Sequence, residues 1–454
     1  MCSSAMGRTE WHERRFGKST TNASFPPLLL EHRCPMQVTP DYYEMINIGF
    51  GPAGIALACA LEETAQGPLD TRQCLFLEKN ASCAWHPEFL LDGTDINHHV
   101  LRDLVTPRNP QSRHSFAMYL KEHGRLYQFG LLGRPASRNE WSDYVAWVGK
   151  AFAPYVHYGE EVEEIRPVME GGEVRQLLVV TSKGHYLTRN LVLSTGSTPN
   201  IPRQFARLDS TRVIHTSRYL SSIETLDRQA SWSFAVIGSG QSAGESIVDL
   251  LNRFPNAQVT SIHRSSGFKI AQLGQFPNQA FHPDRVAYFH KLGQAEKSMI
   301  LEEVKSTNYS GIDVDESQAL YSLFYEGLVS NKPKLALQIF THIESASHTA
   351  THVTLQTCDP YTQERSSVSV DYVILGTGYT QDYIPSALSQ LQPWLTLGND
   401  NGVQVERNYK LATDPLFKPA IFVNGLSERS HGIGEGQSFS LLAMRAGVLT
   451  HSLF

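Results

Sequence analysis

Two glycine-rich turns constrain this chain more than any other feature of its sequence. The first, Gly49-Phe50-Gly51-Pro52-Ala53-Gly54, follows the mostly apolar run Met45–Ile48, and the second, Gly238-Ser239-Gly240-Gln241-Ser242-Ala243-Gly244, follows Phe234–Ile237. In a dinucleotide-binding turn the glycines allow a tight bend, close approach of the backbone to a pyrophosphate, and close packing of helix on strand. The N–H groups at the helix start then hold the phosphates. One such turn is weak evidence, but two predict two nucleotide sites, one for FAD and one for a nicotinamide.

The residues that end the second strand of each fold indicate which nucleotide is bound. The apolar run from Cys74 ends at Glu78, where a dinucleotide fold places an acid that binds ribose hydroxyls. The alternative is a solvated glutamate at a strand end. The run Gln258–His263 instead ends at Arg264, followed by two serines. A guanidinium with hydroxyls suits a 2′-phosphate, so we predict NADPH rather than NADH, the alternative being that Arg264 is a surface charge.

The chain has 454 residues, which predicts two or three domains. We expect an α/β protein in which the NADPH domain is inserted into the FAD domain, with a small substrate-binding region. The chain would cross between the domains at Ser194-Thr195-Gly196 and at Gly376-Thr377-Gly378-Tyr379, and it would close with a helix within Gly434–Leu449. The predicted parts are a mobile N-terminal extension at 1–40, the FAD domain at 41–212, the NADPH domain with substrate-site segments at 213–343, and the rest of the FAD domain with a C-terminal substrate helix at 344–454.

Composition excludes several classes of function. A net charge of −6 and a pI near 6.3 argue against a nucleic-acid partner. No apolar run approaches the roughly 20 residues of a membrane span. The six cysteines form no CxxC pair and no metal-ligand spacing, so we expect no metal, buried thiols at Cys59 and Cys74, and a cytoplasmic location. The extension at 1–40 carries both arginines and glutamates, which favours a mobile segment over a targeting signal.

Further motifs, together with the two turns, carry a resemblance to a known family. They are Phe76-Leu77-Glu78, Trp85-His86, Arg102-Asp103-Leu104, Asn308-Tyr309-Ser310, Gly376-Thr377-Gly378-Tyr379 and Glu428-Arg429-Ser430-His431-Gly432. From about residue 41 to the end, the chain resembles the flavin-dependent N-hydroxylating monooxygenases, the L-ornithine N5- and L-lysine N6-monooxygenase family. The resemblance implies that NADPH reduces FAD, that the reduced flavin traps O2 as a C4a-hydroperoxide, and that a substrate amine attacks it. It also implies ornithine as substrate, a role in siderophore biosynthesis, and a homotetramer.

The resemblance implies roles for several residues in the cofactor sites. Trp85 and His86 would abut the flavin, although Trp85 could instead be a core anchor. Asn97 aligns with a glutamine that family members place near the flavin and NADP. Arg218 would clamp the 2′-phosphate with Arg264. Gln241 and Ser242 would lie by the pyrophosphate or the nicotinamide ribose, unless Ser242 merely starts the helix.

The same resemblance implies a substrate site in which this chain departs from the family. Ornithine hydroxylases hold the substrate carboxylate with a lysine, and that position is Arg102 here. The two family asparagines are retained as Asn278 and Asn308, and the family serine of the C-terminal helix as Ser440. Because a guanidinium is bulkier than an ammonium and binds carboxylates bidentately, two hypotheses stay open. The site takes ornithine with a different grip, or it takes another amine such as lysine or the more acidic aspartate.

Two further classes share part of this pattern. Baeyer–Villiger and sulfoxidation flavin monooxygenases also have two glycine turns, but they show a Phe-x-Gly run before the second turn. This chain has His215-Thr216-Ser217-Arg218-Tyr219 with no such run before it. A flavin-binding redox sensor without catalysis is disfavoured by the intact second turn and by Asn308-Tyr309-Ser310. We therefore predict an enzyme, an NADPH-dependent flavin N-monooxygenase that acts on a small amine and O2.

Overall fold

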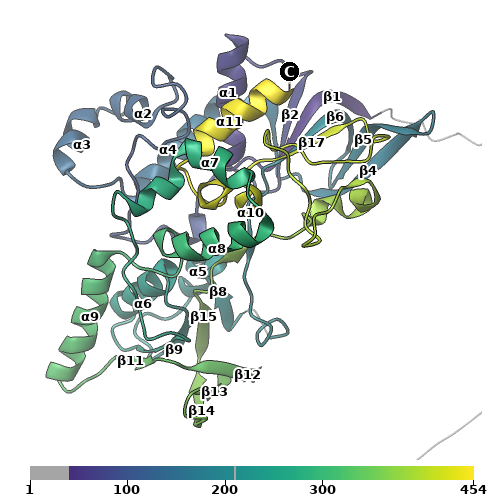
Figure 1. Cartoon of the computed structure of the whole chain (residues 1–454). Helices are drawn as coiled ribbons and strands as arrows, with labels where there is room; N and C mark the ends of the chain where they lie inside the picture. Colours follow the sequence, from purple (N-terminus) through teal and green to yellow (C-terminus); the bar gives the residue numbers. More distant parts are fainter. Residues whose placement is uncertain (1–39, 209–210, 454) are drawn as a thin grey trace, which may run out of the picture. The chain divides into compact units, whose positions relative to one another are not determined.

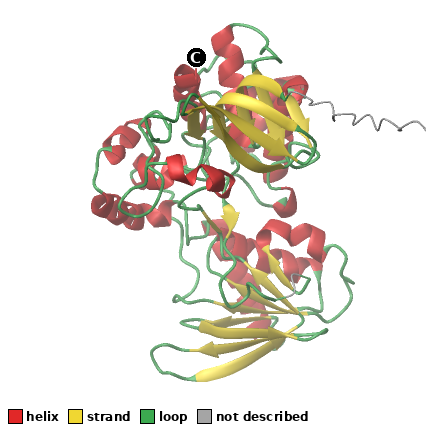
Figure 2. Ribbon diagram, turned by 90° about the vertical axis from the view of Figure 1, so that its right-hand side faces the viewer, coloured by secondary structure: helices red, strands yellow, loops and turns green. Residues whose placement is uncertain are grey.

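A computed structural model describes residues 40–208 and 211–453 of the chain (Figure 1). The predicted mobile extension, apart from its last residue, lies outside the described residues. The described chain contains both helices and strands throughout its length, as expected for the α/β class (Figure 2). The α-helices are α1 (Pro52–Ala65), α2 (Phe116–Glu122), α3 (Leu126–Leu132), α4 (Arg138–Ala151), α5 (Tyr219–Ile223), α6 (Gln241–Arg253), α7 (Pro283–His290), α8 (Gln294–Val304), α9 (Val314–Val329), α10 (Glu428–His431) and α11 (Leu442–Leu453). The 3-10 helices are η1 (Pro87–Phe89), η2 (Ala153–Tyr155), η3 (Thr216–Arg218), η4 (Pro277–Phe281), η5 (Lys305–Thr307), η6 (Ser386–Trp394) and η7 (Ile433–Glu435).

The first sheet contains the first glycine turn. Its strands are β1 (Asp41–Ile48), β2 (Cys74–Glu78), β3 (Val156–Tyr158), β4 (Val162–Glu170), β5 (Glu173–Thr181), β6 (His185–Leu193) and β17 (Ala420–Val423). They run in the order β3-β2-β1-β6-β5-β4, and β17 also pairs with β6. The strands β3, β2, β1, β6 and β17 pair in parallel, while β5 pairs antiparallel with both β4 and β6. Every residue of β2 is buried, which explains its continuous apolar run, because parallel sheets are covered on both faces.

The C-terminal segment returns to this first sheet, as the sequence predicts. Strand β17 pairs with β6, and helix α11 packs beside α1 (Figure 1). The predicted closing helix is shorter than expected, because α11 begins only at Leu442 and the 3-10 helix η7 occupies part of the preceding segment. The placement of Ser440 on the C-terminal helix was therefore wrong: it lies two residues before α11, in a turn.

The second sheet contains the second glycine turn and is entirely parallel. Its strands are β8 (Val213–His215), β9 (Ser233–Ile237), β10 (Gln258–Ile262), β11 (Leu335–Gln338) and β15 (Tyr372–Leu375), in the order β11-β10-β9-β15-β8. Because β15 lies between β9 and β8, this sheet extends past the predicted boundary at residue 343. The cause is the parallel crossover, which brings a late strand back between two earlier ones.

Two small sheets complete the described fold. A three-stranded antiparallel sheet of β12 (His342–His348), β13 (Val353–Cys358) and β14 (Arg365–Val370) precedes β15. The strands β7 (Thr198–Pro199) and β16 (Tyr379–Thr380) pair antiparallel where the chain leaves the first sheet and where it returns. Asn200 ties these two crossings together, since its N–H donates to Gly378 O at 2.9 Å and its Nδ2 donates to Thr377 O at 3.1 Å.

Separate apolar cores lie behind the two main sheets. The core of the first sheet includes Cys59 and Cys74, so the prediction of buried thiols is confirmed. The core of the second sheet contains two side chains from the first part of the chain, Phe89 and Leu91, beside Tyr219 of α5. These two residues follow the Trp85-His86 motif closely. The motif therefore lies next to the point where the first fold packs into the core of the second.

A buried polar chain joins the first glycine turn to the C-terminal segment. Asn47, a buried polar residue of strand β1, donates to Gly49 O at 2.6 Å and accepts from Ser194 Oγ at 2.7 Å. Asn424 donates to the same Ser194 Oγ at 3.0 Å and accepts from Arg445 Nε at 2.8 Å. Each of these side chains has its partners, so the network fixes how the C-terminal segment seats against the turn.

Candidate functional site

The first glycine turn has the geometry of a phosphate cradle. Gly49 has a φ of +95°, and a Cβ at this position would lie 2.4 Å from Ser194 O. A Cβ at Gly54 would lie 2.4 Å from Gly49 O, so only glycine lets α1 pack this closely on the turn. A Cβ at Gly51 would meet nothing within 4 Å, and Pro52 starts the helix, where its missing N–H costs nothing. Open space at Gly51 beside the first N–H groups of α1 fits a pyrophosphate.

Glu78 ends β2 next to this turn, as predicted, and it is 7% exposed. Its Oε2 accepts from Phe50 N at 2.7 Å, and its Oε1 accepts from Asn80 N and Asn80 Nδ2 at 2.9 and 2.7 Å. A carboxylate has about four lone-pair sites, so Glu78 retains acceptor capacity for a ribose hydroxyl. The turn and the acid thus fit the adenosine end of a dinucleotide.

The second turn repeats this geometry. Gly238 has a φ of +134°, and its Cβ would lie 2.3 Å from Gly376 O. The nearest atoms to a Cβ at Gly240 are those of the Ser310 backbone at 3.9 Å, which places the motif Asn308-Tyr309-Ser310 over this turn. Ser239 Oγ lies 3.4 Å from Ser265 Oγ, so the turn meets the segment that carries Arg264. Arg264 is exposed and free of the sheet, as a 2′-phosphate ligand requires.

The structure sets a condition on the predicted clamp of Arg218 with Arg264. Arg218 ends η3 after strand β8, whereas Arg264 follows β10, and two strands separate β8 from β10. At about 4.8 Å per strand, the two strand ends lie roughly 14 Å apart. Both arginines leave the same edge of the parallel sheet, so a nucleotide along that edge could contact each. Their meeting on one phosphate stays a prediction.

Gln241 and Ser242 begin helix α6, directly after Gly240. The Gln241 side chain is already bound by the protein: its Nε2 donates to Glu245 Oε1 at 3.0 Å, and its Oε1 accepts from Asp313 N at 2.9 Å. The same side chain also hydrogen-bonds with Glu316, so the protein fixes its orientation at the start of α6. Gly378, with a φ of +73° and nothing within 4 Å of a Cβ, accepts from His215 Nε2 at 3.0 Å through its carbonyl.

An aromatic wall lines the region where flavin and substrate were predicted to meet. We use this name for Trp85, His98, Trp141 and Phe439, whose ring centroids lie between 5.2 and 5.5 Å apart in four pairs. Trp85 is partly buried and also packs edge-on against His86 at 4.7 Å. Burial, together with the nearby charge of Arg102, lowers the pKa of His98 to about 4, so His98 is neutral at pH 7.

Two of the predicted substrate residues meet at this wall. Arg102 Nη1 donates to Ser440 Oγ at 3.1 Å, across 338 positions of sequence. Because Ser440 follows Phe439 directly, the guanidinium lies beside the wall that Trp85 helps to form. Burial lowers the pKa of Arg102 below its ordinary value, but a guanidinium stays charged at neutral pH. The arrangement can therefore bind a carboxylate next to an apolar surface.

The asparagines are less closely engaged. Asn278, in η4, is half-buried, and its Nδ2 donates to Gly274 O at 3.0 Å; the same 3-10 helix packs on η7 near Ser440. Asn308 is exposed, and Asn97 is exposed with its N–H donating to Asp95 Oδ1 at 3.0 Å. Among the described residues, none of these three side chains forms a hydrogen bond with Arg102, so their substrate or catalytic roles stay predictions.

Three of the nine described non-glycine residues with a positive φ lie in segments that the sequence singled out. His86, Asn97 and Ser310 have φ values of +50°, +52° and +61°, in the left-handed region that non-glycine residues seldom adopt. Each such residue costs about 1 kcal/mol or more, and such residues persist where the surroundings determine them, often at functional sites. The other six lie elsewhere in the described chain, so a positive φ by itself does not distinguish the predicted site.

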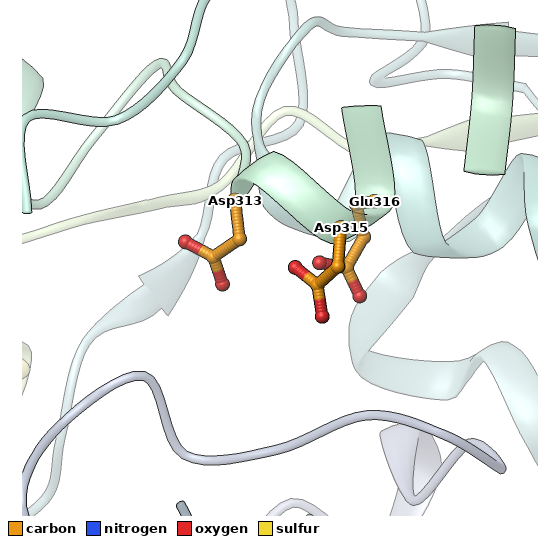
Figure 3. A group of neighbouring side chains, drawn as sticks. All are labelled: Asp313, Asp315 and Glu316. Atoms are coloured by element: carbon orange, nitrogen blue, oxygen red, sulfur yellow. The ribbon is translucent and has the colours of Figure 1, made fainter. Parts of the chain in front are cut away.

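Three carboxylates gather at the start of α9, beside the second turn (Figure 3). They belong to Asp313, Asp315 and Glu316, and one oxygen from each lies within 4.8 Å of the others. Burial, with neighbouring acids, raises the pKa of Asp313 to about 6. Burial and a hydrogen bond with Asp315 raise the pKa of Glu316 to about 7. Acid groups this close are common without a metal, and the expectation of no metal stays untested.

Comparison with known proteins decides the family. Residues 41–381 match the family model described as L-lysine 6-monooxygenase/L-ornithine 5-monooxygenase. The chain belongs to this family. Among its relatives, an L-ornithine N(5)-monooxygenase from Pseudomonas aeruginosa is 37% identical over 425 residues, covering 92% of this chain and 94% of the relative. The prediction of an N-hydroxylating flavin monooxygenase is confirmed at the level of the family, and the Baeyer–Villiger hypothesis is set aside.

Solved structures of family members match the whole fold. A protein described as L-lysine 6-monooxygenase from Pseudomonas syringae aligns with a TM-score of 0.83 and 49% identity, covering 90% of this chain and 99% of its own. The ornithine N-hydroxylase from Kutzneria sp. 744, described with reduced FAD, NADP+ and L-ornithine, aligns with a TM-score of 0.84 and 31% identity, covering 91% and 99%. The two-domain arrangement predicted from the sequence, an NADPH domain inserted in an FAD domain, is confirmed. Among the described residues, no helix combines the length and the apolar character that crossing a bilayer requires.

Sequence reasoning missed several members of this family site. Phe439, Trp141 and His98 complete the aromatic wall, yet nothing in their local sequence distinguishes them from core residues. Tyr309 and Glu428 both stand in quoted motifs, and the structure joins them through a 2.6 Å hydrogen bond from Tyr309 Oη to Glu428 Oε2. The available signal for the contact between Tyr309 and Glu428 was that both residues lie in motifs that carry the family resemblance.

Proposed function

We propose that this chain hydroxylates the N5 nitrogen of L-ornithine with FAD, NADPH and O2. One oxygen atom of O2 forms the new N–O bond and the other leaves as water, while NADPH supplies two electrons as hydride and a proton completes the water. Bound FAD would accept hydride from NADPH and activate O2. The observation that carries the proposal is the pair of Arg102 and Ser440 beside the aromatic wall. The ornithine substrates of the Pseudomonas and Kutzneria relatives support it.

The residues of the chain would divide the work between charge and shielding. Arg102 and Ser440 would hold the substrate carboxylate through charge-assisted hydrogen bonds. The side-chain amine would then extend along the aromatic wall towards the flavin. An amine of this type has a pKa of about 10.4 in water, and an apolar surface disfavours its charged form. Trp85, Trp141 and Phe439 would also exclude water from the reacting atoms.

Lysine is the second candidate substrate. The relative from Pseudomonas syringae, 49% identical, is described as an L-lysine 6-monooxygenase. Lysine differs from ornithine by one methylene, which a pocket discriminates by about 1–3 kcal/mol. Aspartate stays open as well, because the fork of Arg102 suits a carboxylate and the exposed Lys269 offers another cation.

A substrate panel tests the proposal. Purified full-length protein is supplied with FAD, NADPH and O2, together with ornithine, lysine, aspartate or putrescine, and hydroxylamine product is measured beside hydrogen peroxide. We expect ornithine to give the highest kcat/KM and the least peroxide, and NADPH to exceed NADH. Faster turnover of lysine would favour the second candidate. Oxidation of NADPH without oxygen transfer to any amine would instead support a redox sensor and contradict the proposal.

Three wider properties belong with this proposal. A cytoplasmic location is supported by the buried free thiols and by the need for NADPH. A homotetramer follows from the resemblance to the family and is tested by light scattering. A hydroxylated ornithine would serve siderophore or related biosynthesis, because an N-hydroxy group is the precursor of an iron-binding hydroxamate.

A further inference from the structure

A buried ion pair joins the fold of the first glycine turn to that of the second. Arg138, the first residue of α4, donates from Nη1 and Nη2 to the two carboxylate oxygens of Glu245 in α6, at 2.9 and 2.7 Å. The Arg138 side chain is 12% exposed and that of Glu245 is 2% exposed. A bidentate pair this deeply buried is geometrically specific, because both hydrogen bonds weaken when either side chain moves.

On one side, Arg138 is anchored in the part of the chain that carries the flavin motif. Its backbone N–H donates to Thr94 O at 3.0 Å, and Ser137 Oγ caps the same helix by accepting from Glu140 N at 3.1 Å. Its guanidinium lies 5.8 Å from the ring centre of Phe89, in the segment that follows Trp85-His86. The position of Arg138 is therefore set by the first fold.

On the other side, the pair reaches the second glycine turn. Glu245 Oε1 also accepts from Gln241 Nε2 at 3.0 Å, and Gln241 Oε1 accepts from Asp313 N at 2.9 Å. Gln241 is the first residue of α6 and follows Gly240 directly. Arg138, Glu245 and Gln241 thus form one hydrogen-bonded line from α4 of the first fold to the predicted nicotinamide site.

We propose that Arg138 is a positioning residue that holds the second glycine turn where a bound nicotinamide can reach the flavin. The inference rests on the proposed function. Hydride transfer needs reacting atoms about 3–3.5 Å apart, and a misplacement of 1 Å can cost about 10²-fold in rate. The groups expected to hold the phosphates, Arg264 and the N–H groups of the turn, are separate from this pair. Arg138 therefore controls the rate of flavin reduction rather than the affinity for NADPH.

Charge around the pair strengthens this assignment. Glu245 and the carboxylates of Asp313 and Glu316 lie near one another at the start of α6 and α9. The described groups whose charges act on Asp313 are Asp315, Asp95, Glu245 and Arg138, and Arg138 is the cation of that set. Without Arg138, Glu245 would face Asp313 and Asp95 with no counter-charge, and α6 would lose this ion pair with the first fold.

The test compares Arg138→Gln and Arg138→Lys with the wild-type holoenzyme in anaerobic stopped-flow reduction by NADPH. At saturating NADPH we expect Arg138→Gln to lower the limiting rate of flavin reduction by about 10²-fold while the Kd for NADPH stays within about twofold, and Arg138→Lys to recover part of the rate. Arg113→Gln is the matched control, since Arg113 pairs with Glu62 at the surface and its side chain is 71% exposed. Arg264→Ala should show the opposite split, a raised Kd with an unchanged limiting rate.

A second readout does not depend on turnover. In hydrogen exchange of the full chain without NADPH, Arg138→Gln should speed exchange at the start of α6 and leave β1 and α1 unchanged. The double variant Arg138→Gln with Glu245→Gln removes the uncompensated buried charge, so it should recover thermal stability without recovering the reduction rate. If Arg138→Gln fails to fold, the lysine and double variants carry the same comparison.

The outcomes separate the two levels of inference. A folded, FAD-loaded Arg138→Gln variant that reduces at the wild-type rate overturns the positioning role. Recovery of the rate together with stability in the double variant overturns it too, because the effect would then be one of folding alone. Failure of NADPH to reduce the flavin of the wild-type protein would contradict the proposed function itself.

Discussion

Arg102 is the residue on which substrate choice depends most directly. Its guanidinium is planar, carries five donors and stays charged when partly buried. The structure uses one donor on Ser440, which leaves the fork available for a carboxylate. A lysine at this position would offer a point charge on a flexible stem. Arginine in its place therefore changes the geometry of carboxylate binding and not only the size of the side chain.

Replacing Arg102 with Ala should weaken amino-acid binding and leave flavin reduction by NADPH nearly intact. Hydrogen bonds to a charged group contribute about 1.5–3 kcal/mol, so the KM for ornithine should rise roughly 10- to 100-fold. Peroxide release should rise as well, because a poorly held amine leaves the site open to water. Steady-state kinetics and a peroxide assay measure both. The control is Arg113→Ala, and loss of FAD from Arg102→Ala would place Arg102 at the cofactor instead.

At the scale of elements, the two glycine turns place strand, turn and helix so that two nucleotides lie on one molecule. The three glycines of the first turn act differently. Gly54 allows contact between helix and turn, whereas Gly51 borders open space. One position therefore serves folding and the other serves the ligand, although both belong to one motif.

Gly51→Ala and Gly54→Ala should separate these two roles. The added methyl at Gly51 meets no protein atom, so unfolding of the flavin-free protein should change little, while FAD affinity falls because the methyl enters the phosphate space. At Gly54 the methyl would lie 2.4 Å from Gly49 O, so the protein should lose about 1–3 kcal/mol of stability. Thermal unfolding and FAD titration of both variants distinguish them. Equal loss of stability in the two would refute this division.

At the scale of the whole molecule, acids from distant segments accumulate where α6 and α9 begin. Burial and neighbouring acids raise the pKa of Asp313 to about 6, and burial with a hydrogen bond to Asp315 raises that of Glu316 to about 7. Their ordinary values are 3.8 and 4.5. The folded state therefore binds protons more tightly than the unfolded state, and stability falls as pH rises between about 4 and 7.

Glu316→Gln should remove part of this loss. The amide keeps the size and hydrogen bonding of the side chain but carries no charge above pH 7. We expect Tm to rise by about 2 °C at pH 8 and by less at pH 5, where the wild-type carboxyl is already mostly protonated. Thermal unfolding at both pH values measures the difference. Glu326→Gln, at an exposed position of the same helix, is the control, and a rise of equal size at both pH values would rule out the titration.

The parts of this site that the sequence predicted are those in which neighbouring residues suffice. The glycine turns and the acid at Glu78 are local patterns, and each is present at its expected place. The late start of α11 was missed, although the segment before Leu442 is rich in glycine and serine, which disfavour a helix, and folds as η7 and turns. The predicted end of the NADPH domain left out β15, which belongs to the second sheet, because the order of strands in a sheet depends on contacts distant in sequence.

By itself, the sequence determined that two dinucleotide folds exist, where their phosphate turns lie and which family the chain resembles, since these features follow from steric demands within a few residues. Only the tertiary structure decided that Arg102 meets Ser440, that Trp85 packs on Phe439, and that Arg138 pairs with Glu245. The physical reason is that these contacts join segments about 100 to 350 positions apart. Their formation depends on how whole strands and helices pack, which no local pattern encodes.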